Sequence, residues 1–274
     1  MLKNIRNYLG VLAILVWGLA PFYWMLVTAL RDSDWTFDTT PWPTHVTLDN
    51  FRNALATDAG NNFLAAIGNS LIIGLVTTAA SVLVGVFAAY ALARLDFRGK
   101  GIVTGVVLAA SMFPGIALVT PLFQLFGDLG WIGTYRALII PNISFALPLT
   151  IYTLVSFFQQ LPWELEEAAR VDGASRGQAF RLVLLPLAAP ALFTTAILAF
   201  IAAWNEFMLA KQLSTTGTEP VTVAIARFSG PSAFEYPYTS IMAAGALVTV
   251  PLVIMVLVFQ RRIVAGLTAG GVKA

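Results

Sequence analysis

The twenty residues from Glu167 to Pro186, EAARVDGASRGQAFRLVLLP, form a polar, arginine-bearing segment between two long apolar runs. Just before this segment, Pro162 suits the first turn of a helix, where its missing N–H has no partner to lose. The ten residues after it predict a short helix, with Glu166 and Arg170 four positions apart and able to pair on one face. The chain is therefore expected to leave one apolar run through a polar helix.

Gly173 predicts the end of that helix and a tight reversal, because glycine adopts the left-handed conformation without steric cost. Ser175 and Gln178 have the spacing of a capping box for a second short helix. Pro186 is then expected to close the second helix or lead it into the next apolar run. The local pattern predicts a compact helix, turn and helix that protrudes between two spans.

The same segment resembles the EAA loop of binding-protein-dependent, ATP-driven importers. That loop reads E-A-A, three residues, G, nine residues, then an apolar residue, any residue and L-P. The matching residues are Glu167-Ala168-Ala169, Gly173, Val183 and Leu185-Pro186. The resemblance extends over nearly the whole chain, including Trp204-Asn205-Glu206-Phe207 and the terminal FQRRIVAGLTAGGVKA, and is closest to MalG-type permeases that import disaccharides.

This resemblance implies an all-α integral membrane protein with six transmembrane helices in the type I importer (MetI-like) permease fold. It implies one of two permease subunits in a bacterial or archaeal cytoplasmic membrane, with a second MalF-like permease, two ATPase subunits and an extracytoplasmic sugar-binding protein as partners. The segment around 162–186 would couple the chain to the ATPases through Glu167, Ala168, Ala169, Asp172 and Gly173. ATP and Mg²⁺ would bind the ATPases, so this chain would be neither an enzyme nor the holder of a cofactor or metal. A disaccharide such as trehalose or maltose is the expected substrate, with an amino sugar, another oligosaccharide or a glycerophosphate ester as alternatives.

Composition independently indicates a membrane protein. The 274 residues are 58% hydrophobic and only 11% charged, with a mean hydropathy of +0.79, which is too apolar for an ordinary soluble domain. The absence of cysteine excludes disulfides, thiol catalysis and cysteine metal sites. A pI near 9.0 can indicate nucleic-acid binding, but the basic residues gather between apolar runs and favour membrane topology instead.

Six uncharged runs are long enough to cross a hydrocarbon core, which needs about 20 residues. They are Tyr8–Leu30, Phe63–Ala93, Gly101–Gly127, Ala137–Leu161, Leu182–Asn205 and Tyr236–Gln260. These runs predict an N-terminal helix and outer loop over residues 1–62, a five-helix permease core over 63–262 and a cytosolic tail over 263–274.

Lysine and arginine fall unevenly on alternate sides of these runs. One side carries Lys3, Arg6, Arg94, Arg98, Lys100, Arg170, Arg176, Arg181, Arg261, Arg262 and Lys273. The other carries only Arg31, Arg52, Arg136, Lys211 and Arg227. Because cytosolic loops are enriched in basic residues, both termini and the Glu167 segment are expected to face the cytosol.

Two outer loops, Asp32–Asn62 and Ser214–Pro237, are expected to touch the binding protein. The lone His45 in the first loop predicts a surface residue without a catalytic role, since no metal-ligand pattern accompanies it.

Small residues recur every four positions in two of the runs, which favours close helix packing over a direct transport role. They are Ser81, Gly85, Ala89 and Ala93 in one run and Gly101, Gly105 and Ala109 in the next. Prolines are expected to kink or interrupt the helices that contain them. These are Pro114, Pro141, Pro148, Pro190 and Pro251.

Trp204, Asn205 and Glu206 form a second candidate site at the end of the fifth run. A carboxylate in the membrane is costly unless it faces water or a partner, so Glu206 is expected to line a cavity or a subunit interface. The alternative is that it reaches the outer membrane surface near Lys211, and the sequence does not decide between the two. An amide beside a flat aromatic ring is a combination suited to sugars, which makes Asn205 and Trp204 candidates for the substrate pathway.

No phosphate-binding G-x-x-x-x-G-K-[ST] loop occurs, because Arg94 stands where the first glycine before Gly99-Lys100 should be. A secondary transporter driven by an ion gradient would instead require an inverted repeat and ionisable residues near mid-membrane, and Glu206 alone fits that description. A membrane scaffold that transports nothing is a third alternative. Both alternatives leave the EAA spacing unexplained.

Overall fold

The computed structural model describes residues 2–56, 62–228 and 236–271. Contacts divide the chain into two compact units, residues 1–67 with 223–253 and residues 68–222 with 254–274. Within the described ranges the regular structure is helical, and β pairing is limited to an isolated bridge between Arg31 and Val46. The prediction of an all-helical chain is confirmed. The proposed division at residues 62 and 262 stays a prediction.

The first unit contains an N-terminal helix, a folded loop and parts of three further helices. Its elements are α1 (Leu2–Ala29), η1 (Ser33–Trp35), α2 (Asp49–Leu55), the first residues of α3 (Phe63–Arg94), most of α12 (Val221–Ala226) and the first half of α13 (Tyr238–Gly271). The predicted second outer loop therefore contains a short helix, and its residues 229–235 lie outside the described ranges.

Arg31 organises the loop between α1 and α2. Its side chain is fully buried, its guanidinium donates hydrogen bonds to the carbonyls of Asp38 and Thr40, and it lies 5.1 Å from the centre of the Trp24 ring. The Asp38 carboxylate accepts hydrogen bonds from the hydroxyls of Thr44 and Thr40 at 2.6 and 2.7 Å. These bonds favour the charged form and lower the pKa of Asp38 to about 2.

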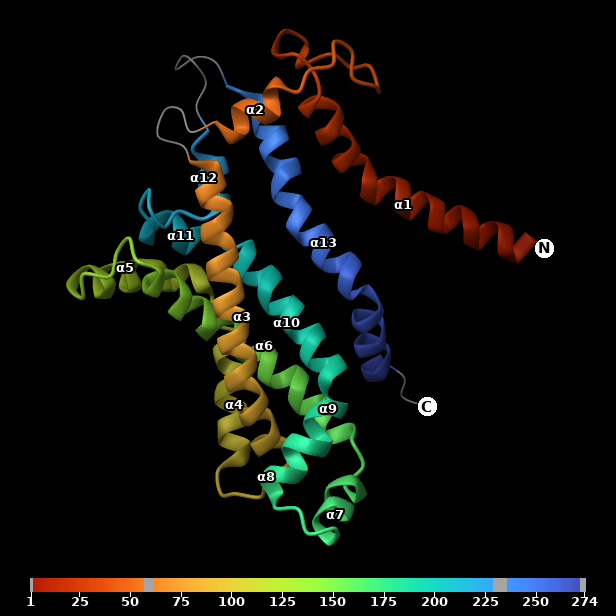
Figure 1. Ribbon diagram of the computed structural model, residues 1–274, viewed down its shortest axis with the longest axis vertical. Coiled ribbons are helices and arrows are strands. Elements are labelled where there is room, and N and C mark those ends of the chain that lie inside the picture. Colours follow the sequence, from red (N-terminus) through yellow and green to blue (C-terminus); the bar gives the residue numbers. More distant parts are fainter. Residues whose placement is uncertain (1, 57–61, 229–235, 272–274) are drawn as a thin grey trace. The chain divides into compact units, whose positions relative to one another are not determined.

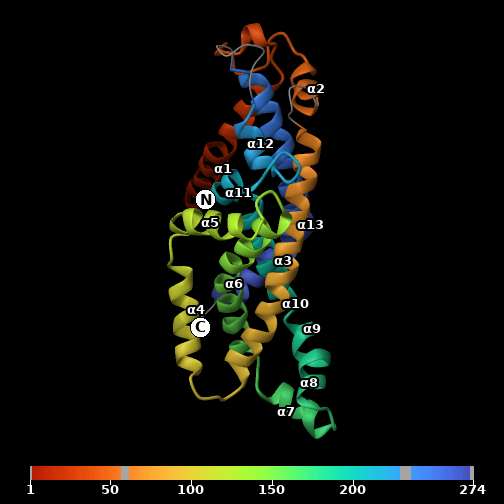
Figure 2. The same cartoon turned by 90° about the vertical axis from the view of Figure 1, so that its left-hand side faces the viewer.

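The second unit holds both candidate sites. Its elements are the rest of α3, α4 (Lys100–Ser111), η3 (Gly115–Leu118), α5 (Val119–Asp128), α6 (Tyr135–Gln160), α7 (Glu164–Val171), α8 (Arg176–Ala179), η4 (Phe180–Leu184), α9 (Leu185–Leu187), α10 (Ala189–Trp204), α11 (Met208–Leu213) and the end of α13. In Figures 1 and 2, α7 and α8 lie at one end of this unit, past the ends of α3 and α6.

Four helical segments are long and apolar enough to cross a membrane, namely Asn7–Ala29, Phe63–Arg94, Tyr135–Gln160 and Tyr238–Gln260. Two further apolar segments consist of helix pairs bent at a short break. The described part of the chain has six candidate spans if each bent pair counts as one.

The run from Gly101 to Gly127 is not the single straight span that its length predicts. α4 ends at Ser111, and the chain turns by 87° before continuing through η3 into α5, which lies crosswise to α4 (Figure 2). Pro114 sits in the break with an extended backbone. Its ring and missing N–H are unfavourable in a helix interior, and here the helix ends before it.

The fifth predicted span is also bent, by 71° between α9 and α10. Pro190 lies in the first turn of α10, where the absence of its N–H is harmless. Pro186 lies in α9, directly after the wide turn of η4, whose backbone follows the i to i+5 pattern of a π-helix. The other expected kink sites lie inside continuous helices: Pro141 and Pro148 in α6 and Pro251 in α13.

The two stripes of small residues have different outcomes. All four members of the α3 stripe are buried, and a Cβ on Gly85 would lie 2.4 Å from the Thr150 side chain of α6. Close packing through the α3 stripe is therefore confirmed. The α4 stripe is exposed, and a Cβ on Gly101 or Gly105 would meet no atom within 4 Å, so the predicted packing of this stripe is wrong within the described chain.

Candidate coupling and pathway sites

α7 and α8 form the predicted helix, turn and helix. Gly173 has a φ of +91°, its N–H donates to the carbonyl of Arg170, and the N–H of Ala174 donates to the carbonyl of Ala169. This pair of bonds is the Schellman ending of a helix, which uses a left-handed residue at Gly173. Ser175 and Gln178 cap each other's backbone groups at the start of α8, as the sequence predicts.

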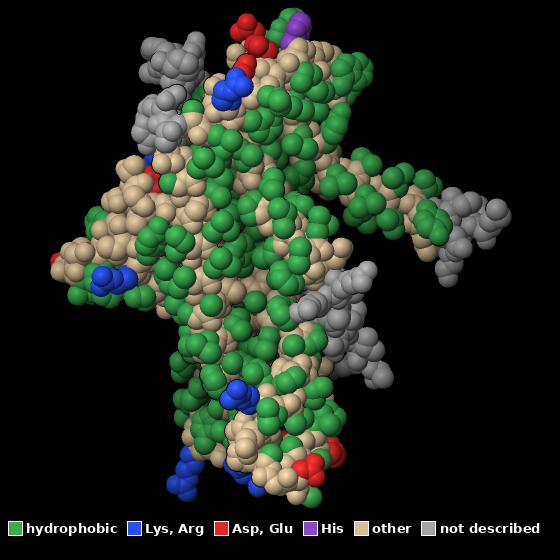
Figure 3. Space-filling view, in the orientation of Figure 1, with side chains coloured by type: hydrophobic (Ala, Val, Ile, Leu, Met, Phe, Trp, Pro, Cys, Tyr) green, Lys and Arg blue, Asp and Glu red, His purple; other side chains and the backbone are tan. Residues whose placement is uncertain are grey.

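Most of the predicted coupling residues are on the surface. Glu167, Ala168, Asp172 and Gly173 are exposed, and Ala169 is half-buried. Val171 is 87% exposed, which gives this polar surface an apolar side chain. Figure 3 shows charged side chains gathered at the α7–α8 end of the unit and hydrophobic side chains over the helices behind it.

Glu166 does not form the ion pair with Arg170 that the spacing predicts. Its side chain turns inward, is only 7% exposed, and accepts a hydrogen bond from the Tyr90 hydroxyl of α3 at 3.1 Å. Its second carboxylate oxygen is buried without a hydrogen-bond partner. The long-range contact with α3 overrides the weak local pairing, which is worth only about 0.2–0.5 kcal/mol on a helix surface.

Arg94, the last residue of α3, holds the chain where it enters the loop. Its Nη2 donates to the carbonyl of Leu161 at 2.6 Å, and its guanidinium lies 4.4 Å from the centre of the Trp163 ring. The residue is only 5% exposed, and its Nε and Nη1 are buried without hydrogen-bond partners. Arg94, which is not among the predicted site residues, thus contacts both ends of the Leu161–Trp163 connection.

An aromatic cluster lies where the α7–α8 segment meets α3 and α6. Tyr90, Phe158 and Phe180 meet with ring centres 4.5 to 6.2 Å apart, and Phe158, Phe180 and Leu184 belong to one buried hydrophobic core. The cluster joins α3, α6 and the π-helical turn η4. The exposed face of α7 therefore rests on a packed base.

The three consecutive residues of the second candidate site have different environments. Trp204 is 1% exposed and stacks on Phe200 with ring centres 5.5 Å apart, so the predicted sugar-stacking face is not available in this structure. Asn205 is exposed, and its amide donates to the carbonyl of Ile201 in the preceding turn. Of the three, Glu206 lines a pocket.

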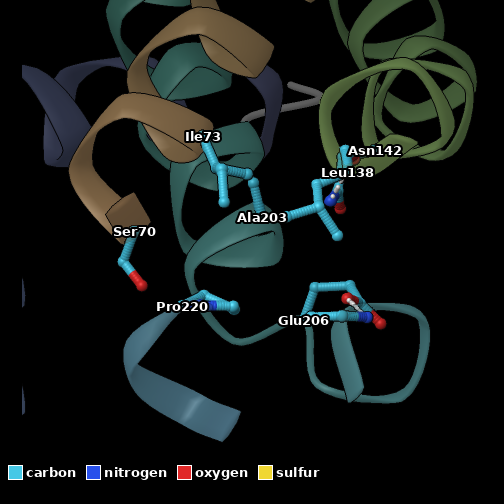
Figure 4. A pocket seen from close by; sticks show the side chains of 8 residues that line it. Ser70, Ile73, Leu138, Asn142, Ala203, Glu206 and Pro220 are labelled. Atoms are coloured by element: carbon cyan, nitrogen blue, oxygen red, sulfur yellow. Dashed lines mark hydrogen bonds between the residues drawn. The ribbon is translucent and has the colours of Figure 1, made fainter. Parts of the chain in front are cut away.

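Glu206 accepts hydrogen bonds from the backbone N–H groups of Leu209 and Ala210 at 2.8 and 2.9 Å, which caps the start of α11. No ion pair joins it to Lys211 within the described residues; the Lys211 ammonium instead lies 5.6 Å from the centre of the Phe207 ring. The carboxylate is thus held by backbone donors at the wall of a hollow (Figure 4).

The hollow joins residues that the sequence holds far apart. Its lining consists of Ser70, Ile73, Leu138, Asn142, Ala203, Glu206, Ala210 and Pro220. The volume of about 220 Å³ at this place includes open space outside the hollow, so the enclosed part is smaller than that and lies well below the roughly 300–1,000 Å³ of typical small-molecule sites. This chain alone does not enclose a disaccharide there.

Further polar residues brace the same region and were not predicted as site residues. Asn69 accepts a hydrogen bond from the Tyr135 hydroxyl at 2.7 Å and donates to the carbonyl of Glu219 at 2.9 Å. Ser70 accepts from the backbone N–H of Val221. The signal for them was present, since Asn69, Ser70 and Asn142 are polar residues inside otherwise apolar runs.

Comparison with known proteins decides the family. The family described as binding-protein-dependent transport system inner membrane component matches residues 81–268, which include both the α7–α8 segment and Glu206. This chain belongs to that family. It is a multi-pass inner-membrane permease component, as the EAA spacing indicates.

Relatives match over almost the full length of the chain. The trehalose transport system permease protein SugB of Mycobacterium tuberculosis is 49% identical, with 97% of each chain covered. The trehalose/maltose transport system permease protein MalG of Thermococcus litoralis is 44% identical, covering 100% of this chain and 98% of the relative. Among solved structures, a bacterial ABC transporter involved in the import of the acidic polysaccharide alginate has a TM-score of 0.78 at 22% identity, covering 95% of this chain and 96% of that chain. That likeness shows the type I importer permease fold.

Proposed function

We propose that this chain is one of two permease subunits in an ATP-driven importer for a disaccharide, with trehalose as the first choice and maltose as the second. The observation that carries the substrate class is the full-length similarity to two permeases named for trehalose, at 49% and 44% identity. The small hollow at Glu206 fits half of a pathway whose other half comes from a second permease. Two ATPase subunits and an extracytoplasmic binding protein complete the assembly.

In this assembly the α7–α8 segment serves as the coupling element. Glu167, Ala168, Ala169, Asp172 and Gly173 would contact a groove on an ATPase subunit, with exposed Val171 seated in an apolar part of that groove. Both termini and this segment would face the cytosol. Five of the basic side chains that support this orientation, Lys3, Arg6, Arg261, Arg262 and Lys273, lie outside the side chains that the structure describes.

The mechanism would be a shift between two packings of the permease pair. Closure of the ATPase dimer on ATP would draw the coupling segments together and open the pathway outward, and hydrolysis would reset it. Such a shift requires that energy enter through contacts that differ between the two states. Asn205 and Glu206 remain the proposed pathway residues of this chain.

The test is uptake of labelled trehalose by proteoliposomes that contain this chain, its second permease, the ATPases and loaded binding protein. We expect ATP-dependent uptake, competition by unlabelled maltose, and no ATP hydrolysis by this chain alone. Uptake driven by an ion gradient without ATP would overturn the importer mechanism. Uptake that an amino-sugar disaccharide inhibits, but trehalose and maltose do not, would overturn the substrate assignment.

A further inference from the structure

Beneath α7, two buried groups of opposite charge each keep unused hydrogen-bonding capacity. The Glu166 carboxylate uses one oxygen with Tyr90 and leaves the other unpaired, and the Arg94 guanidinium leaves Nε and Nη1 unpaired. Both residues are more than nine-tenths buried. Unpaired buried charge is unfavourable, so each group gains if it finds a partner.

Tyr90 is the present partner of Glu166 and lies on the same helix as Arg94. Arg94 follows it by one helical turn on α3, so the two side chains share a face of that helix. Glu166 approaches the same face from α7 and bonds the Tyr90 hydroxyl. No ion pair joins Arg94 to Glu166 within the described residues, because their charged atoms lie beyond 4.0 Å. A movement of α7 along the α3 axis by about one helical turn, about 5.4 Å, would release the contacts of Arg94 with Leu161 and Trp163 and place Glu166 opposite the guanidinium instead.

The surrounding contacts favour discrete positions over gradual sliding. At the start of the last turn of α3, Tyr90 packs on Phe180 with ring centres 4.5 Å apart. At the end of that turn, Arg94 holds the carbonyl of Leu161 and lies over the ring of Trp163. Packed side chains of this kind give alternative arrangements instead of continuous deformation.

We propose that Glu166 is a positioning residue that exchanges the Tyr90 hydroxyl for the Arg94 guanidinium when α7 moves during the transport cycle. The Tyr90 bond holds the coupling segment in the position seen here, and the Arg94 pair holds it in the second position. This inference rests on the proposed contact of α7 with the ATPase. The exchange gives that contact two defined positions relative to α3.

Removal of the Tyr90 hydroxyl and removal of the Arg94 guanidinium are therefore expected to change ATP hydrolysis in opposite directions. Tyr90→Phe removes only the hydroxyl that favours the present position, so hydrolysis without binding protein should rise about tenfold, the scale of one hydrogen bond to a charged group. Arg94→Gln removes the partner of the second position, so hydrolysis stimulated by loaded binding protein should fall about tenfold relative to the unstimulated rate. A role in folding alone would lower both rates together.

The experiment measures both rates in the assembled complex, each divided by the amount of complex recovered. Arg94→Lys keeps the charge and should restore most of the stimulation lost in Arg94→Gln. Glu166→Ala removes both acceptor oxygens, so it should change the two rates in the same directions as the double variant Tyr90→Phe/Arg94→Gln. Glu164→Ala is the matched control, because Glu164 is an exposed carboxylate in the same first turn of α7.

Two outcomes overturn the exchange. One is that Tyr90→Phe and Arg94→Gln change the hydrolysis rates in the same direction. The other is that Arg94→Lys loses as much stimulation by binding protein as Arg94→Gln does. Glu167→Lys, measured alongside, separates this failure from that of the proposed function. If Glu167→Lys and Gly173→Val keep normal stimulation and uptake, the coupling role of α7 is wrong and the exchange with it. If these two variants uncouple hydrolysis from uptake while Tyr90→Phe and Arg94→Gln change the hydrolysis rates in the same direction, the exchange alone is wrong.

Discussion

The α7–α8 segment and the Glu206 hollow lie in the same unit but are built in different ways. The first takes its shape from consecutive residues: a helix, a left-handed glycine and a capping box within 162–186. The second joins α3, α6, α10 and the chain around Pro220. A site made from neighbouring residues can be recognised from spacing, whereas a site made from distant helices depends on packing that spacing does not encode.

The largest effect is expected from removal of the left-handed turn at Gly173. We expect Gly173→Val to abolish uptake, or to lower it more than tenfold, because a β-branched residue at a φ of +91° costs about 1–3 kcal/mol and the two helices would misalign. A Cβ at this position would meet no atom within 4 Å, so the effect is conformational. The measurement is trehalose uptake per reconstituted complex.

Gly177→Ala is the control for Gly173→Val. Gly177 lies in α8 with an ordinary helical φ, and a Cβ added there would likewise meet no atom within 4 Å. Uptake should therefore stay within about twofold of the unsubstituted protein. Equal loss in both variants would show that any added side chain on this surface blocks the partner, and the left-handed turn would not be the cause.

How far the sequence predicts each site follows from this difference in construction. The turn at Gly173 and the capping box of Ser175 have local causes, and both were predicted. The inward turn of Glu166 was not, because Tyr90 lies 76 positions away and only the fold brings it near. The 87° bend at Pro114 was predicted as an interruption, but its size depends on the crosswise packing of α5, which local sequence does not specify.

A second test changes charge on the exposed face of α7 and leaves the backbone intact. Glu167→Lys should lower the stimulation of ATP hydrolysis by loaded binding protein about tenfold, because it reverses a charge at the proposed partner surface. Glu167→Gln should have a smaller effect, and binding-protein docking should persist in both. If a charge reversal in the ATPase groove fails to restore any Glu167→Lys function, direct charge pairing at this position is wrong.

A third test concerns the Glu206 hollow. Glu206→Gln should lower uptake about three- to tenfold, because an amide has one acceptor oxygen for the two N–H groups that the carboxylate now binds. Asn205→Ala should lower uptake less, by about twofold, since its amide bonds only its own helix and its side chain is exposed. Complex recovery must be normal in both. Unchanged uptake in both variants across a range of trehalose concentrations would remove this site from the pathway.

The smallest effect is expected in the Arg31 loop, outside both sites. The pKa of Asp38 falls to about 2 on folding, so its stabilising contribution is present above about pH 4 and is lost as the pH falls from there towards 2. Hydrogen exchange of residues 38–44, corrected for the intrinsic pH dependence, should show less protection at pH 3 than at pH 5. Asp38→Asn should remove this pH dependence, and protection that still falls in the variant would assign it to another group.

The wide turn of η4 has a consequence for the evolution of the segment. A π-helical turn holds one more residue than an α-helical turn, so deleting one residue from Phe180–Leu184 would convert it to ordinary α-helix without opening the chain. The wide turn and the ordinary α-helical turn each cover about one full revolution, so this deletion would leave the Glu167 surface at nearly the same angle around the helix relative to α10. A deletion from regular α-helix would instead rotate that surface by about 100°. A single-residue deletion is therefore expected to disturb the segment less within Phe180–Leu184 than elsewhere in the helix that contains it.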